Sequence, residues 1–262
     1  MIEKGNKKKA VIAKVFEICR ERGTDIFDND LVREVCKEIG FGNPFDATAF
    51  HNSAKLPDIL KANDVFILHL GKGRHCFARG IDVGYHSFED IPETRCFDWK
   101  YRKSVLNESD TSEANVLAVA ANQRVIHDFL YEDIVAAPKI YFSRRTNATF
   151  DLGVGRERYS VSDVQMEVDL TFEYQGLVTI FEAKNGFPED FAVYQLYNPF
   201  RYYYIMREAG DVAVEAVSCC YVLRERTDGA SVLRLYEYEF EAPENLGSLS
   251  LKKAAEYRLL ER

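Results

Sequence analysis

One stretch, residues 165–184, constrains the fold of this chain more than any other. In its first half, hydrophobic side chains alternate with polar ones, at Met166, Val168, Leu170 and Phe172. After Gly176 comes a β-branched and aromatic run, residues 178–181. Alternation with period two and a glycine between two such runs are typical of a β-hairpin. The sequence therefore predicts two antiparallel strands joined by a turn.

Charged residues occur at fixed spacings on both predicted strands. Side chains two residues apart share one face of a strand, so Glu167 and Asp169 point one way, and Glu182 and Lys184 point together. The hydrophobic content of the strands is that of central strands in a sheet. Charges in such a position need a partner or a metal ion.

These residue types suit metal-assisted hydrolysis of a phosphodiester. Asp169 and Glu182, with the carbonyl oxygen of Ala183, offer the hard oxygen ligands that Mg²⁺ prefers. Lys184 would orient the attacking water or help to deprotonate it, and would offset negative charge in the transition state. A surface hairpin with a cross-strand salt bridge would use the same residues, and this alternative stays open.

The spacing of these residues carries a resemblance to a known group of enzymes. Asp169, followed thirteen residues later by Glu182-Ala183-Lys184, resembles the signature of the PD-(D/E)XK nuclease superfamily, which includes many type II restriction endonucleases. Val168 stands where that superfamily often has proline. The resemblance implies a C-terminal α/β/α core of the restriction-endonuclease kind, Mg²⁺ as cofactor and double-stranded DNA as substrate.

Two further site residues follow from the resemblance. Gln195, eleven residues after Lys184, resembles a glutamine that some branches place on the next helix, facing the active site; Pro199 stands where those branches usually have tyrosine. Glu113 matches an acid that the helix before the first core strand sometimes contributes to the metal site. The helix dipole also favours a glutamate in the first turn, so a purely structural role for Glu113 is an alternative.

Length and composition bound the remaining possibilities. The 262 residues carry a formal net charge of −8, which argues against a protein that coats nucleic acid indiscriminately. No window approaches eighteen consecutive apolar residues and the N-terminus lacks a signal-peptide pattern, so we expect a cytoplasmic protein without a membrane partner. A polar connector near residues 107–110 divides the chain into domains 1–106 and 107–262.

The N-terminal domain resembles a winged helix-turn-helix module. Periodic apolar residues predict helices over residues 6–22 and 28–39, and a third helical segment over residues 46–62 that is interrupted or bounded at Pro57. A hairpin with a glycine-rich turn follows over residues 65–79. In such modules the third helix lies in the major groove and the hairpin contacts the DNA backbone.

The resemblance identifies candidate DNA-binding residues in that domain. Thr48, His51, Asn52 and Lys55 would lie on the exposed face of the third helix, within reach of base edges. Lys72 and Arg74, at the tip of the hairpin, would contact phosphates. Modules of this kind also serve in protein interaction or dimerisation, and that alternative stays open.

The C-terminal domain is predicted to contain helices on a mixed sheet of about five strands. A helix should begin at Ser112 and continue to Leu130, and a strand should cover residues 139–143. After the hairpin predicted over residues 165–184, a helical segment precedes strands over residues 212–224 and 232–240, and residues 249–260 are predicted to form a closing helix. Four arginines in polar stretches beside the hairpin would grip phosphates or read guanine, or simply lie in solvated loops: Arg144, Arg145, Arg156 and Arg158.

The sequence thus predicts an α/β protein that acts as a type II restriction endonuclease, a Mg²⁺-dependent enzyme that cuts double-stranded DNA at a specific sequence. Because one active site cuts one strand, we expect a homodimer. A cognate DNA methyltransferase acting on the same site is a further implied partner. Two alternatives remain: a winged-helix DNA-binding regulator with a non-catalytic C-terminal domain, and a structure-specific repair or junction nuclease.

Overall fold

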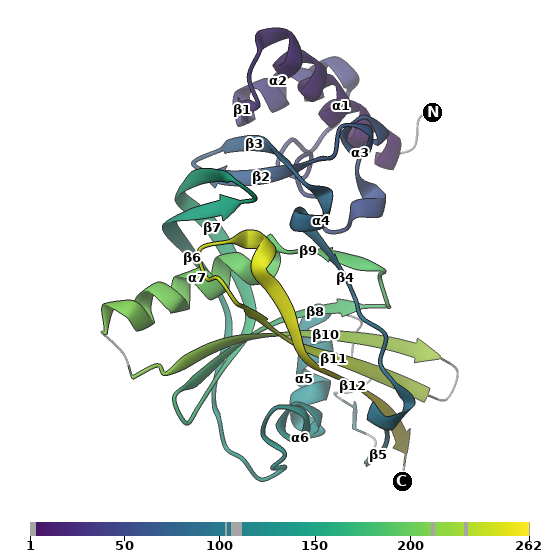
Figure 1. Cartoon of the computed structure of the whole chain (residues 1–262). Coiled ribbons are helices and arrows are strands. Elements are labelled where there is room, and N and C mark those ends of the chain that lie inside the picture. Colours follow the sequence, from purple (N-terminus) through teal and green to yellow (C-terminus); the bar gives the residue numbers. More distant parts are fainter. Residues whose placement is uncertain (1–3, 103, 106–111, 211–212, 228–229, 262) are drawn as a thin grey trace.

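The computed structural model describes residues 4–102, 104–105, 112–210, 213–227 and 230–261. The N-terminal part, purple and blue in Figure 1, lies at one end of the molecule, and a large sheet with its helices forms the rest. The α/β class predicted from the sequence is confirmed. Within these ranges, no helix combines the length and the hydrophobicity needed to span a membrane.

Two helices open the N-terminal part where the sequence predicts them. Helix α1 (Lys4–Arg22) buries an apolar stripe that includes Val11 and Val15. Helix α2 (Asn29–Ile39) begins after Asp28, whose carboxylate accepts hydrogen bonds from two backbone N–H groups of the first turn. It ends at Gly40, which adopts the left-handed conformation.

A three-stranded sheet completes this part in the order β1-β3-β2. Its strands are β1 (Ile26–Asp28), β2 (Val65–Gly71) and β3 (Arg74–Arg79), so the predicted hairpin is confirmed. The end of β2 lies directly against strand β7 (Glu157–Tyr174) of the large sheet. A Cβ atom on Gly71, whose φ is +81°, would lie 2.0 Å from the carbonyl oxygen of Ser162. Only glycine permits this approach.

The third helical segment predicted over residues 46–62 is confirmed only after Pro57, and the part before Pro57 is wrong. Residues 44–48 form turns, Ser53–Lys55 form one turn of 3₁₀ helix, and α3 covers only Asp58–Ala62. The Asn52 side chain accepts a hydrogen bond from the backbone N–H of Lys55, and Pro57 then separates this turn from α3. Thr48 is therefore buried instead of lying on an exposed helix face.

The large sheet has seven strands instead of the predicted five or so. Their order is β5-β12-β11-β10-β8-β7-β6, with parallel pairing only between β8 and β10 and between β12 and β5. In chain order the strands are β5 (Cys96–Tyr101), β6 (Lys139–Val154), β7 (Glu157–Tyr174), β8 (Leu177–Asn185), β10 (Ala216–Thr227), β11 (Ala230–Phe240) and β12 (Leu249–Glu261).

Helices cover both faces of this sheet. On one face, α5 (Glu113–Asn122) and α6 (Val125–Tyr131) share a hydrophobic cluster with side chains of β7, β8 and β10–β12. On the other face, α7 (Tyr194–Ala209) shares a second cluster with the sheet and with the N-terminal part. The single helix predicted from Ser112 to Leu130 is wrong at one point, because Arg124 adopts a left-handed conformation (φ +62°) and separates α5 from α6.

The predicted closing helix over residues 249–260 is also wrong, since this segment is strand β12. Its residues alternate in burial, with Ala255, Tyr257 and Leu259 facing the cluster under α5 and α6. The segment is rich in helix-forming residues, but it completes the sheet by pairing with β11 on one side and β5 on the other. Tertiary pairing therefore outweighs local propensity here.

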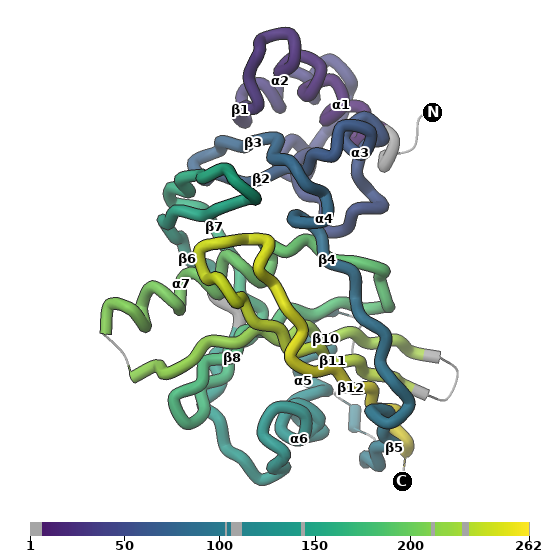
Figure 2. The backbone as a smooth tube through the Cα atoms, viewed as in Figure 1, coloured from purple at the N-terminus to yellow at the C-terminus, as the bar shows by residue number. Residues whose placement is uncertain are grey.

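The segment after β3 connects the two ends of the molecule, as Figure 2 traces from α4 to β5. It contains α4 (Ile81–Gly84) and β4 (Tyr85–Ser87), which pairs with β9 (Asp190–Ala192). A turn of 3₁₀ helix, Glu93–Arg95, then leads into β5. The sequence predicts a domain boundary at residues 106 and 107, yet β5 already belongs to the large sheet.

Candidate metal and phosphodiester site

The β7–β8 hairpin brings Asp169 and Glu182 together. Gln175 and Gly176 both have positive φ values, and they form the tight turn between the strands. The strands pair up to Leu170 opposite Phe181, so the next residues along are Asp169 and Glu182. The backbone N–H of Ala183 donates to Oδ2 of Asp169 over 3.3 Å. That the carbonyl oxygen of Ala183 supplies a metal ligand stays a prediction.

Lys184 connects the hairpin to helix α5. Its Nζ lies 2.7 Å from a carboxylate oxygen of Glu182 and 2.7 Å from one of Glu113. Glu113 is the first residue of α5, and the preceding Ser112 caps that helix by accepting a hydrogen bond from the backbone N–H of Asn115. The Asn115 side chain in turn accepts from Arg224 of β10. The start of α5, which carries Glu113, is thus attached to strand β10 of the sheet.

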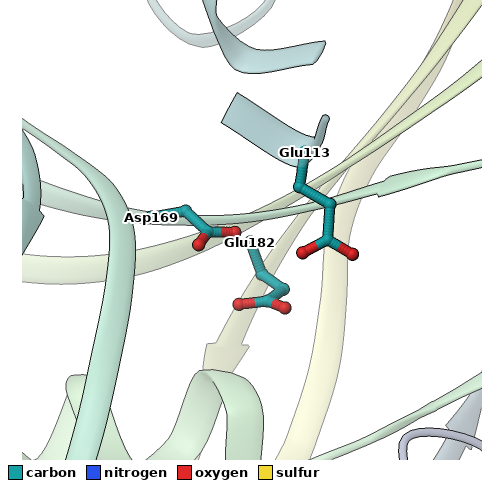
Figure 3. A group of neighbouring side chains, drawn as sticks. All are labelled: Glu113, Asp169 and Glu182. Atoms are coloured by element: carbon teal, nitrogen blue, oxygen red, sulfur yellow. The ribbon is translucent and has the colours of Figure 1, made fainter. Parts of the chain in front are cut away.

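Three carboxylates converge at this point, from α5, β7 and β8. Glu113, Asp169 and Glu182 each offer an oxygen, and these oxygens lie within 4.8 Å of one another (Figure 3). With Lys184, the ionised group carries three negative charges and one positive charge. The remaining charge of −2 is unfavourable beside buried residues unless a cation or protons offset it.

The electrostatics of the group reflect this excess of negative charge. Burial, together with the negative charges of Asp169 and Glu113 and against the opposing effect of Lys184, raises the pKa of Glu182 to about 8. Burial likewise raises the pKa of Asp169. For Lys184, burial lowers the pKa, but the attraction of Glu182 and the hydrogen bonds to Glu113 and Glu182 outweigh it, and the pKa is raised overall.

Gln195 also reaches the site, from the first turn of α7. Its Nε2 donates a hydrogen bond of 2.7 Å to Oε1 of Glu182, the same oxygen that accepts from Lys184. The Oε1 atom of Gln195 is buried and has no partner among the described residues. Glu182 is therefore held from two sides, and an acceptor remains available beside it.

A cleft of about 740 Å³ opens over these residues. Its wall comes from both parts of the chain, because His51, Asn52 and Lys55 of the N-terminal part line it together with the hairpin and α7. These three were predicted on a helix face, and they lie instead in a loop and a 3₁₀ turn beside the carboxylates.

The remaining candidate DNA-binding residues whose side chains the structure describes do not line this cleft. Lys72, with a φ of +50°, and Arg74 are exposed at the β2–β3 turn. Among the arginines, Arg145 forms an ion pair with Glu167, and Arg158 with Glu244. Arg156 is exposed in the turn between β6 and β7, and the side chain of Arg144 lies outside the described residues. The polar stretches that carry them form one long two-stranded ribbon.

Sequence reasoning missed several residues of the cleft. Tyr194, Asn198, Asp190 and Tyr221 line it, and none was a candidate. Asn198 lies one turn after Gln195, so helical spacing alone could have indicated it. Tyr221 stands next to Glu182 in the parallel pairing of β10 with β8, which only the sheet order reveals.

Comparison with protein families divides the chain in two. A model described as a domain of unknown function, DUF6997, matches residues 81–258. The chain belongs to the DUF6997 family. A second model, also a domain of unknown function (DUF6996), matches residues 9–77. Searches of curated proteins and of solved structures returned no match.

The DUF6997 match contains every residue of the carboxylate site, from Glu113 to Gln195. The DUF6996 match contains His51, Asn52 and Lys55. The cleft is thus lined by residues from both matched regions, which meet between residues 77 and 81.

Proposed function

We propose that this chain is a Mg²⁺-dependent endonuclease that hydrolyses phosphodiester bonds of double-stranded DNA at a specific sequence. The observation that carries the proposal is the convergence of Glu113, Asp169 and Glu182 beside Lys184 at an open cleft. Oxygen ligands from a few carboxylates, with room for water and phosphate oxygens, are what Mg²⁺ requires. The net charge of −2 in the group also suits a divalent cation.

The order of the elements supports the same proposal. Helices α5 and α6, strands β6, β7 and β8, the short strand β9, helix α7 and strand β10 follow one another along the chain. This order resembles the α/β/α core of the PD-(D/E)XK nucleases, and Asp169, Glu182 and Lys184 stand at the positions of their signature. A specific recognition sequence and a cognate methyltransferase are proposed from this resemblance.

Each side chain of the site would have its own role in the hydrolysis. A bound divalent cation would polarise the scissile phosphate and lower the pKa of a water molecule. Asp169, Glu182 and Glu113 would hold that cation. Lys184, kept in place by two carboxylates, would donate to the attacking water or to a phosphate oxygen and stabilise developing negative charge. Gln195 would keep Glu182 oriented through its hydrogen bond.

Among the described residues, the chain contains one such cluster of carboxylates, and one active site cuts one strand of the DNA. We therefore propose that two copies of the chain act together on a duplex. A dimer would present two clefts related by a two-fold axis, which matches a symmetric recognition sequence. Equilibrium sedimentation with and without DNA measures this, and a strictly monomeric species that cuts both strands in one encounter would contradict it.

Cleavage of a plasmid tests the proposed activity. Purified protein is incubated with supercoiled DNA in Mg²⁺, and the ends of the fragments are sequenced. We expect discrete fragments with a common sequence at their ends. Asp169→Ala and Lys184→Ala should lower the cleavage rate at least about a hundredfold while DNA binding in Ca²⁺ persists, because they remove chemistry and not the cleft.

The same experiment separates the alternatives. DNA binding without cleavage in any divalent cation would indicate a regulator with a non-catalytic C-terminal domain. Cleavage only of branched or damaged DNA would indicate a repair or junction nuclease. Equal cleavage by the wild type and both variants would contradict the assignment of the site.

A further inference from the structure

A loop from the N-terminal part, residues 51–55, lies in the wall of the cleft that contains the carboxylates. Its side chains His51, Asn52 and Lys55 line the same 740 Å³ space as Glu182 and Lys184. This loop lies more than a hundred residues before Asp169 and Glu182 in the sequence, so its position beside them depends on long-range contacts.

Two sets of hydrogen bonds attach the loop to strand β9. The backbone N–H of Ser53 donates to Oδ1 of Asp190 over 2.9 Å, and the hydroxyl of Ser53 donates to the other carboxylate oxygen. The backbone N–H of Ala192 donates to the carbonyl oxygen of His51 over 3.0 Å. These hydrogen bonds hold the loop alongside β9, and both carboxylate oxygens of Asp190 accept from Ser53.

Strand β9 leads directly into α7, which carries Gln195. Only Val193 and Tyr194 separate Ala192 from Gln195, and Gln195 contacts Glu182. The loop is therefore joined through β9 to Gln195, the side chain that donates a hydrogen bond to Glu182. A substrate contact made by the loop would have a fixed distance from the carboxylates.

The positive charge of Lys55 makes it the residue of the loop that suits contact with a DNA phosphate. The residues that line the cleft include two lysines, Lys55 and Lys184. Lys184 is occupied by Glu182 and Glu113. Lys55 is exposed, and within the described part of the chain no carboxylate forms an ion pair with it. An exposed, unpaired ammonium can take a phosphate oxygen at little cost in desolvation.

We propose that Lys55 binds a backbone phosphate of the DNA strand that is being cut, one or a few positions from the scissile bond. The inference rests on the proposed nuclease function and adds to it a substrate-binding residue. It also changes the role of the N-terminal part: the loop grips the backbone at the reacting site instead of reading bases from a separate recognition helix.

Binding measurements on the full-length protein test the inference. Affinity for a cognate duplex and for a duplex of random sequence is measured in Ca²⁺ at several salt concentrations, for the wild type and for Lys55→Ala. We expect affinity to fall about tenfold on both duplexes, because a charge-assisted hydrogen bond is lost. The slope of log affinity against log salt should decrease by about 0.9, the value for one phosphate contact.

Two variants provide matched controls. Lys37→Ala removes an exposed lysine of the same part of the chain that does not line the cleft, and it should leave affinity and slope unchanged. Lys55→Arg keeps the charge and should restore most of the affinity. In steady-state cleavage, Lys55→Ala should raise KM more than it lowers kcat.

An unchanged salt slope for Lys55→Ala would overturn the inference, as would a loss confined to the cognate duplex, which indicates base reading. The outcome is separable from that of the proposed function. A wild-type protein that binds DNA but does not cut it refutes the nuclease, while the binding data still decide the role of Lys55. If the Lys55→Ala variant cuts DNA as the wild type does, the inference about Lys55 is refuted and the proposed nuclease function stands.

Discussion

Two buried glutamates on the same sheet have opposite surroundings. Glu237 of β11 is 5% exposed and lies between two lysines of β12, at 3.3 Å from Lys252 and 3.6 Å from Lys253. Glu182 of β8 is 8% exposed, yet its single lysine is shared with Glu113, and Asp169 adds another negative charge.

The difference separates a structural ion pair from a site that calls for a ligand. Around Glu237 the charges balance within the chain, since Lys252 also pairs with Glu239 at 3.9 Å and the group holds two carboxylates and two ammonium groups. Around Glu182 they do not, and the uncompensated charge is located at a cleft. Burial of an acid is therefore not in itself a sign of function, whereas burial with unbalanced charge at an open surface is.

Replacing each glutamate by glutamine gives the largest expected contrast. Glu237→Gln leaves Lys253 without its carboxylate and Lys252 with only the more distant Glu239, and it should lower the free energy of unfolding by about 2 kcal/mol. Glu182→Gln removes one charge from a group that carries an excess, so stability in the absence of divalent cations should stay the same or rise. Urea denaturation in the presence of a chelator measures both.

The effects of the two substitutions on DNA cleavage should be the reverse of their effects on stability. Glu237→Gln should cut DNA at the wild-type rate under conditions where it is folded, and Glu182→Gln should not cut. If Glu182→Gln destabilised the protein as much as Glu237→Gln does, the carboxylate group would be a structural ion-pair network, and the comparison would lose its meaning.

A third buried polar group sharpens the comparison, because it carries no charge. Nδ1 of His69 and Nδ1 of His75 lie 2.9 Å apart, and Nε2 of His75 lies 2.9 Å from Oδ1 of Asn29. If His75 donates to Asn29, its Nδ1 accepts from His69, and both rings are neutral. Burial lowers the pKa of His69 to about 3 and that of His75 to about 4, with the neighbouring ring adding to the effect on His69.

This pair predicts a loss of stability in mild acid. Below the unfolded-state pKa of about 6.5, the unfolded chain binds protons that the folded pair refuses, so stability falls as the pH drops toward 4. Each histidine should account for roughly 1 kcal/mol between pH 6.5 and 5.5. In His69→Gln, which cannot titrate at that position, the loss over this interval should be smaller by about that amount. Equal losses in the two proteins, measured by urea denaturation, would show that the pair accepts protons in the folded state.

The centre of the site was predictable because it depends on local pattern. Alternation along residues 165–184 specifies the hairpin, and side chains two apart must share a face, so Glu182 and Lys184 follow directly. Antiparallel pairing then brings Asp169 beside them. Glu113 and Gln195 came from the resemblance to a nuclease signature, and the structure brings both within hydrogen-bonding distance of the same group.

The parts that sequence reasoning missed depend on distant contacts. The helix-like composition of residues 249–260 gives no sign of the open edge of β11 that this segment fills. The loop at residues 51–55 is fixed by Asp190, 137 residues beyond Ser53, and no local pattern reveals that bond. Arg124 interrupts a regular apolar stripe with a left-handed residue. In each case tertiary structure outweighs a reasonable local preference.

Calorimetric titration of Mn²⁺ into metal-free protein tests the central claim most directly, namely that Glu113, Asp169 and Glu182 form a site for a divalent cation. The account predicts saturable binding to the wild type and to Glu237→Gln, and its loss in Asp169→Ala and Glu182→Gln. Heats that are the same for the wild type and Glu182→Gln would contradict it.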